Sequence, residues 1–212
     1  MAGIIAAQDN GTGVVGVAPG VRIWNVKCTG PAPYNTVVNL IKGMDYVTAN
    51  ATNIAVASIS IATSGNQNIG AVRSAVRRMV QGGIVVVAAA GNNARDIAGI
   101  DGVYTTGSIG DDVVPAALPE AMAVSAMDPA TDTLADFSNY SQIQRTPNYV
   151  ISPGNTIDVA APGVNCLTTA TSNSYVLFSG TSCATPHVSG LVALYTAAHG
   201  RATNAIGVMQ IR

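Results

Sequence analysis

The sequence predicts an α/β fold: a three-layer sandwich in which helices cover both faces of a mostly parallel central sheet. Segments rich in β-branched residues alternate along the chain with segments whose apolar residues recur at helical spacing. The strand predicted over residues 84–88 has no polar interruption, as a strand covered on both faces requires. Parallel strands need right-handed crossovers, and these place helices on both faces of the sheet.

The predicted elements follow one another in a regular order. The strands span residues 21–27, 54–61, 84–88, 121–127 and 157–160, and the helices span residues 34–50, 68–81 and 180–198. Apolar residues at i, i+3 and i+4 mark each helix. The helix over 68–81 is expected to show Arg73 and Arg77 to water and to end at Gly82.

The last third of the chain departs from this alternation. Residues 164–170 and 175–179 flank the turn-forming segment 171–174, which predicts a β-hairpin. Residues 128–156 are polar and punctuated by Pro and Gly, which predicts a surface loop. Because no repeat, low-complexity tract or linker divides the chain, residues 1–212 are expected to form one domain.

Composition and charge argue against several classes of function. Of the 212 residues, 48% are apolar and 10% are charged, and the net charge is −1. The high apolar content excludes disorder, and the scarcity of basic clusters argues against nucleic acid and anionic membranes as partners. No apolar run is long enough to span a bilayer. The three cysteines, Cys28, Cys166 and Cys183, show neither a disulfide framework nor a zinc spacing.

A serine stands where an extended segment turns into a helix, within residues 180–190. The first turn of a helix has unpaired N–H groups and a partial positive charge. Both stabilise the oxyanion that forms when a serine attacks a carbonyl, so Ser182 is a candidate nucleophile. Ser is also a common helix N-cap, and position alone favours this capping role for Ser182.

A second candidate follows the predicted strand over residues 84–88. Gly91 and Asn92 lie at the carboxyl end of this strand, where parallel sheets gather functional groups. The Asn92 amide can point a donor into a cleft there, and one such donor typically contributes ~10²–10³ in rate. Gly-Asn is equally a common turn sequence.

Four segments, in order, resemble those of the subtilisin-like serine peptidases, or subtilases. They are residues 2–19, which resemble the stretch after the family's catalytic His, residues 89–92, residues 158–163, and the nucleophile motif at 180–188. Cys183 stands where the family often has Met. The resemblance implies a serine endopeptidase that hydrolyses peptide bonds through an acyl-enzyme. It implies that Ser182 is the nucleophile and that Asn92, with the Ser182 backbone N–H, forms the oxyanion hole.

The resemblance also implies a site for a peptide or protein substrate. Ser58 and Ser60 match the strand that pairs with a bound peptide, and Ala90 and Gly91 match one wall of the primary specificity pocket. The peptide would add as a strand, so that main-chain hydrogen bonds give affinity and pockets give selectivity. We expect a monomer, and an extracellular location is implied by the resemblance alone.

The same resemblance predicts a peptidase domain that is truncated at both ends. The family's catalytic Asp and His belong to segments upstream of residue 1, so we expect this chain to lack both and to be inactive alone. Without a base, a serine hydroxyl is a weak nucleophile. His187 matches a non-catalytic position, and His199 lies near the end of the predicted helix. The alternatives are a pseudopeptidase that binds peptide without cutting it and an unstable fragment with open sheet edges.

No cofactor is expected for this chain. Residues 8–14 resemble a loop that holds calcium in some members through carbonyls and an Asn such as Asn10. The remaining ligands lie upstream in those members, so we expect no metal here. The Val114–Pro115 bond falls where the family often has a cis peptide, although few X-Pro bonds are cis.

Overall fold

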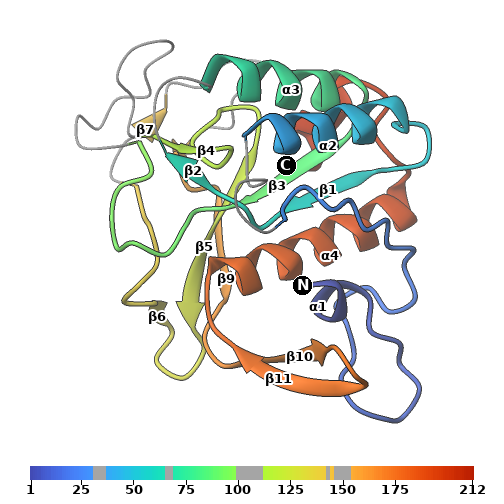
Figure 1. The fold of residues 1–212 in the computed structure, drawn as a ribbon, viewed down its shortest axis with the longest axis vertical. Coiled ribbons are helices and arrows are strands. Elements are labelled where there is room, and N and C mark those ends of the chain that lie inside the picture. Colours follow the sequence, from blue (N-terminus) through green and yellow to red (C-terminus); the bar gives the residue numbers. More distant parts are fainter. Residues whose placement is uncertain (31–36, 65–68, 99–111, 142–143, 146–153) are drawn as a thin grey trace.

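A computed structural model describes residues 1–30, 37–64, 69–98, 112–141, 144–145 and 154–212. Among these residues, a five-stranded sheet forms the middle layer (Figure 1). Its strands are β1 (Val56–Ile59), β3 (Val85–Ala89), β5 (Met122–Asp128), β6 (Thr133–Leu134) and β9 (Val159–Pro162). β1, β3, β5 and β9 run parallel in that order, and β6 pairs antiparallel with β5. The predicted, mostly parallel sheet is confirmed.

Helices cover both faces of this sheet (Figure 1). On one face, α2 (Val37–Ala49) and α3 (Ile69–Gln81) pack side by side, and the short α5 (Ala205–Ile211) contacts α3. On the other face, α4 (Thr181–His199) packs against all four parallel strands, and α1 (Ala2–Ala6) packs against α4. The prediction of three layers is confirmed. None of the described helices has both the length and the apolar character that crossing a membrane needs.

Short antiparallel pairs complete the described elements. β10 (Cys166–Ala170) and β11 (Ser174–Phe178) form the predicted hairpin. β2 (Thr63–Ser64) pairs with β4 (Val113–Val114), and β7 (Gln144–Arg145) pairs with β8 (Gly154–Asn155). The Val114–Pro115 peptide bond is cis, as expected.

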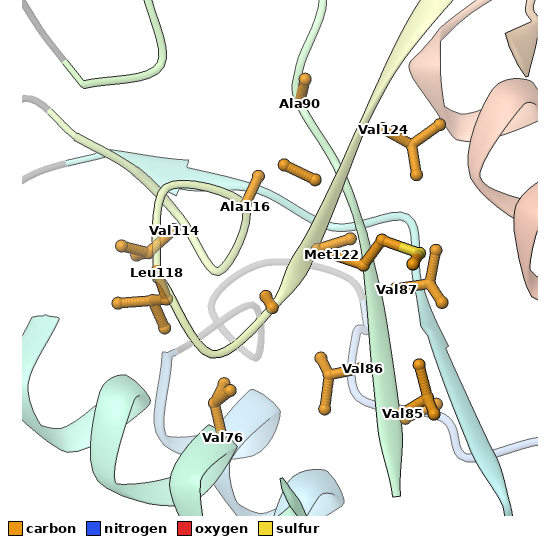
Figure 2. Packing of buried hydrophobic residues seen from close by; sticks show 14 of the residues in the cluster. Val76, Val85, Val86, Val87, Ala90, Val114, Ala116, Leu118, Met122 and Val124 are labelled. Carbon is orange, nitrogen blue, oxygen red and sulfur yellow. The ribbon is translucent and has the colours of Figure 1, made fainter. Parts of the chain in front are cut away.

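The core is built around β3. All five residues of β3 are buried, which explains its unbroken apolar sequence. Figure 2 shows Val86 on the side of Val76, a residue of α3, and shows Val85 and Val87 on the other side of the strand. Because full burial of one valine side chain contributes about 1.5–3 kcal/mol, β3 is a large source of stability for the whole sheet.

Two predictions about individual segments are wrong. Residues 21–27 do not form a strand, because no described strand pairs with them and an extended segment becomes a strand only when a neighbour satisfies its backbone groups. Residues 128–156 are not all surface loop. They contain β6, and Ser138 and Asn139 are buried, at 1% and 0% exposure.

The prediction that both arginines of α3 face water holds for Arg77, whose side chain is 51% exposed, but not for Arg73, whose side chain is 18% exposed. Arg73 Nε lies 3.1 Å from Glu120 Oε1, and Arg77 Nε lies 2.6 Å from the same oxygen. The Glu120 side chain is only 3% exposed. A buried carboxylate is costly unless a charged group pairs with it, so this pairing turns Arg73 toward the protein, while Arg77 reaches the same carboxylate from the surface.

This pairing leads to a stability prediction. Replacing Glu120→Gln removes the charge that Arg73 and Arg77 share, and we expect the free energy of unfolding to fall by about 1–3 kcal/mol. The control is Asp45→Asn, which breaks the ion pair of Asp45 with Arg78. The Asp45 side chain is 50% exposed and the Arg78 side chain is 45% exposed. This substitution should cost less than about 1 kcal/mol. Urea denaturation of both variants measures the difference, and equal losses would contradict this account.

Candidate functional site

Ser182 lies in the first turn of α4, and its side chain is not the helix cap. The N-cap is Gly180, with a φ of 151°, and no side chain caps this helix end. The capping interpretation of Ser182 is therefore wrong. Among the described residues, the half-buried Ser182 hydroxyl has no hydrogen-bond partner. Its backbone N–H belongs to the first turn, where a helix offers no acceptor of its own.

The side chain of Asn92 is held against the same turn. Asn92 Oδ1 accepts hydrogen bonds from Thr181 N at 2.8 Å and from Thr181 Oγ1 at 2.9 Å. Thr181 Oγ1 in turn accepts a hydrogen bond from Gly91 N at 3.0 Å. These bonds use the oxygen of the Asn92 carboxamide and leave its Nδ2 to donate. An ideal Cβ at Gly180 would lie 3.2 Å from that Nδ2, so the amide group lies beside the start of α4.

Asn139 holds the loop that carries Asn92. Its side-chain Oδ1 accepts from Asn93 N at 2.9 Å and from Arg95 N at 3.2 Å. Its Nδ2 donates to Ala90 O at 2.8 Å, and its backbone N donates to Gly91 O at 2.9 Å. This buried side chain therefore ties down both ends of the turn. The sequence analysis missed it, because Asn139 lies in the segment interpreted as a surface loop.

A contact between two glycines fixes the start of α4 relative to β9. Gly180 N donates to Gly163 O at 2.8 Å. A Cβ at Gly163 would lie 2.4 Å from the Cβ of Ala126 and 3.0 Å from Gly180 O. Only a residue without a side chain fits between β5 and the helix start.

The residues proposed to bind substrate lie near the carboxyl ends of β1 and β3 but differ in exposure. Ser60 Oγ donates to Ser182 O at 3.2 Å, so the segment after β1 contacts the first turn of α4 directly. Ser58 is exposed on β1, which among the described strands pairs only with β3. Gly91 is half-buried, with a φ of +99°, and Ala90 is fully buried in the core. Any role of Ala90 in binding therefore falls to its backbone.

Neither histidine of the sequence contacts Ser182. His187 Nδ1 lies 2.8 Å from Cys183 O, one turn back on its own helix. His199 Nδ1 lies 3.1 Å from Tyr195 O, and its ring stacks on Tyr195 with centroids 4.3 Å apart. Both imidazoles are therefore held by α4 itself, and neither is placed to take a proton from the Ser182 hydroxyl.

In the loop that resembles a calcium site, the Asn10 side chain is engaged within the loop itself. Calcium takes about six to eight oxygen ligands. Asn10 Oδ1 already accepts hydrogen bonds from Thr12 N at 3.2 Å and from Thr12 Oγ1 at 2.9 Å. In the part of the chain that the structure describes, no three His, Cys, Asp or Glu side chains gather in a way that could hold a metal.

The chain is similar in sequence to known proteins. A sequence model of the subtilase family matches residues 1–209. The chain is 35% identical over 208 residues to subtilisin E of Bacillus subtilis (strain 168), covering 97% of this chain and 46% of the relative. It is 34% identical over 194 residues to alkaline elastase YaB of Bacillus sp. (strain YaB), covering 92% and 43%. The chain thus spans about half the length of these curated relatives.

Solved structures show the same similarity. Sphericase superposes with a TM-score of 0.76 at 30% identity, covering 99% of this chain and 64% of that protein. A cold-adapted subtilisin-like serine proteinase superposes with a TM-score of 0.71 at 28% identity, covering 92% and 59%. The three-layer fold described above is therefore the fold of these proteins.

The hydrogen bonds of Thr181 lead to a prediction that can be tested without any enzymatic activity. Thr181→Val keeps the shape and the backbone N–H but removes the hydroxyl, which leaves Gly91 N without its acceptor. We expect a loss of about 1–2 kcal/mol in the free energy of unfolding. The Gly91 amide and the Asn92 side-chain amide should shift in ¹⁵N NMR spectra.

The matched control is Thr185→Val. The Thr185 hydroxyl donates to Thr181 O within the same helix and has no bond to the loop of Asn92. This variant should leave the Gly91 and Asn92 resonances in place. Equal shifts in both variants would mean that the Thr181 hydroxyl does not orient Asn92.

Proposed function

The chain belongs to the subtilase family, and from this premise we propose that it is the nucleophile-bearing part of a serine endopeptidase. The proposed reaction is hydrolysis of a peptide bond through an acyl-enzyme on Ser182. The observation that carries the proposal is the pair of hydrogen bonds from Thr181 to Asn92 Oδ1, because they leave Asn92 Nδ2 as a donor beside the turn of Ser182.

Each group in this arrangement has one proposed task. The Ser182 oxygen attacks the substrate carbonyl, and negative charge develops on the carbonyl oxygen. Asn92 Nδ2 and the Ser182 backbone N–H donate hydrogen bonds to that oxyanion. These donors are fixed before the reaction by Thr181 and by the helix, so little reorganisation is needed when the charge appears. Collapse of the tetrahedral intermediate releases the amine, which takes up the proton that the serine gave to the base, and water then hydrolyses the acyl group left on Ser182.

The general base is proposed to come from residues outside this chain. His187 and His199 are both held by their own helix, and an unassisted serine is a weak nucleophile. We therefore expect the chain alone to be essentially inactive. The catalytic Asp and His would be contributed by sequence encoded upstream.

The substrate is proposed to bind along β1 as an added strand. The edge of β1 opposite β3 has no partner among the described strands, and Ser58 is exposed there. Support comes from the hydrogen bond from Ser60 Oγ to Ser182 O, which joins the segment after β1 to the first turn of α4. Main-chain hydrogen bonds to the peptide would supply affinity. A monomeric state and an extracellular location stay predictions from the family resemblance.

A peptide-binding pseudopeptidase is the second candidate. It is favoured by one observation: no described strand covers the outer edge of β1, and neither imidazole has a hydrogen bond to Ser182. The two candidates differ in whether Ser182 becomes covalently modified. They also differ from an unstable fragment, which would not melt cooperatively.

A fluorophosphonate probe tests the proposal on two proteins. The chain of 212 residues should melt cooperatively yet react no faster than its Ser182→Ala variant, because it lacks a base. The same chain extended by its in-frame upstream coding sequence should be labelled at Ser182. An extended protein that folds and binds peptide but is not labelled would favour the pseudopeptidase.

The oxyanion role is tested in the extended protein. Asn92→Ala should lower kcat ~10²–10³-fold with little change in KM, because the donor acts on charge that forms only in the transition state. The matched control is Asn93→Ala, the neighbouring exposed amide, which should leave kcat unchanged. Equal effects of the two substitutions would refute the role of Asn92.

A further inference from the structure

Two of the three cysteines meet beside the first turn of α4. Cys166 is the first residue of β10 and lies directly opposite Phe178 of β11. The Cys183 thiol donates to the Phe178 carbonyl oxygen at 3.4 Å. Both thiols therefore gather around Phe178, close enough for each to influence the acidity of the other. Cys183 is also the residue that follows Ser182.

The two thiols differ in access and in surroundings. Cys166 is half-buried, with its Sγ 3.5 Å from Pro162 O. Cys183 is fully buried, at 0% exposure. The third cysteine, Cys28, lies elsewhere, with its Sγ 3.5 Å from Val26 O. A reagent from solvent therefore reaches Cys166 before Cys183.

The two thiols also differ in acidity: the pKa of Cys166 is lowered, whereas the pKa of Cys183 is raised. The hydrogen bond from Cys183 lowers the pKa of Cys166, and partial burial opposes this effect. The pKa of Cys183 is raised, first by its hydrogen bond to Cys166, then by burial and by repulsion from the Cys166 thiolate. The thiolate is the species that attacks a disulfide. Cys166 is thus the thiol that attacks first, and Cys183 is the thiol that attacks in the second step.

We propose that Cys166 and Cys183 form a disulfide-forming site that is oxidised by low-molecular-weight disulfides such as oxidised glutathione. The Cys166 thiolate attacks one sulfur of the small disulfide, and the other sulfur leaves as a thiolate. Cys183 then attacks the Cys166 sulfur of this mixed disulfide, and the second small thiol leaves with the proton that Cys183 gives up. Two protein thiols and one small disulfide become one protein disulfide and two small thiols.

The mixed disulfide itself prepares the second step. Once Cys166 carries the small thiol, it holds no negative charge, so the two interactions with Cys166 that kept the proton on Cys183 are lost. The completed bond would join the start of β10 to the residue after Ser182. The proposal rests on the placement of the thiols and is independent of the proposed peptidase activity.

Oxidised glutathione and the reduced chain of 212 residues test this site. After acid quenching and alkylation, we expect the loss of two of the three alkylatable thiols and no retained glutathionyl group. Chymotrypsin is the protease of choice, because Tyr175 and Phe178 lie between the two cysteines and no Lys or Arg does. The unreduced digest should contain one peptide pair joined through Cys166 and Cys183.

Three single substitutions assign the steps. Cys28→Ser should leave the reaction unchanged, and Cys166→Ser should abolish it, because the buried Cys183 is shielded. Cys183→Ser should stop the reaction at a stable mixed disulfide on Cys166. If either of the last two variants fails to fold, the peptide mapping of the wild type and of Cys28→Ser decides. Unreacted thiols, a persistent mixed disulfide in the wild type, or a link to Cys28 would each overturn the proposal.

Discussion

The hydrogen bonds between Thr181 and the Gly91–Asn92 turn are the constraint on which the site depends. They join the carboxyl end of β3 to the first turn of α4, two segments 89 or 90 residues apart in sequence. Each bond contributes only about 0.5–1.5 kcal/mol net. Their larger effect is on geometry, because three bonds that share one hydroxyl and one carboxamide oxygen allow only one orientation of the amide group.

The sheet brings these two segments to the same place. In a parallel sheet the carboxyl ends of the strands lie at one edge, and functional groups collect there. β3 is buried on both faces, and α4 packs across β1, β3, β5 and β9. Asn139 and Gly163 then secure the turn and the helix start from either side. The polar site is therefore supported by an apolar frame.

Periodicity predicted the elements that are buried on a regular face. The strand at β3 and the helix at α4 were both evident, because apolar residues repeat there with the spacing of their element. Residues 21–27 misled the same reasoning, because a β-like composition does not say whether a neighbour strand is present. Arg73 looks solvated in the sequence, since its partner, Glu120, is more than forty residues away.

The sequence predicted the central residues of the site but not the residues that hold them in place. Ser182 and Asn92 stand in recognisable motifs, so their convergence could be expected. Thr181 lies within one of these motifs, yet its task is visible only once its distant acceptor is known. Asn139 carried no signal, because a polar residue in a Pro- and Gly-punctuated segment resembles any loop residue.

The β10–β11 hairpin and its root at Gly163 differ in how much sequence variation they tolerate. Every residue of β11 is exposed, so new side chains there meet water and leave the frame undisturbed. At Gly163 even one added methyl group would collide with Ala126 and press on Gly180. Directed evolution of this scaffold can therefore diversify the exposed side chains of β11, while position 163 has to remain glycine for α4 to begin where it does.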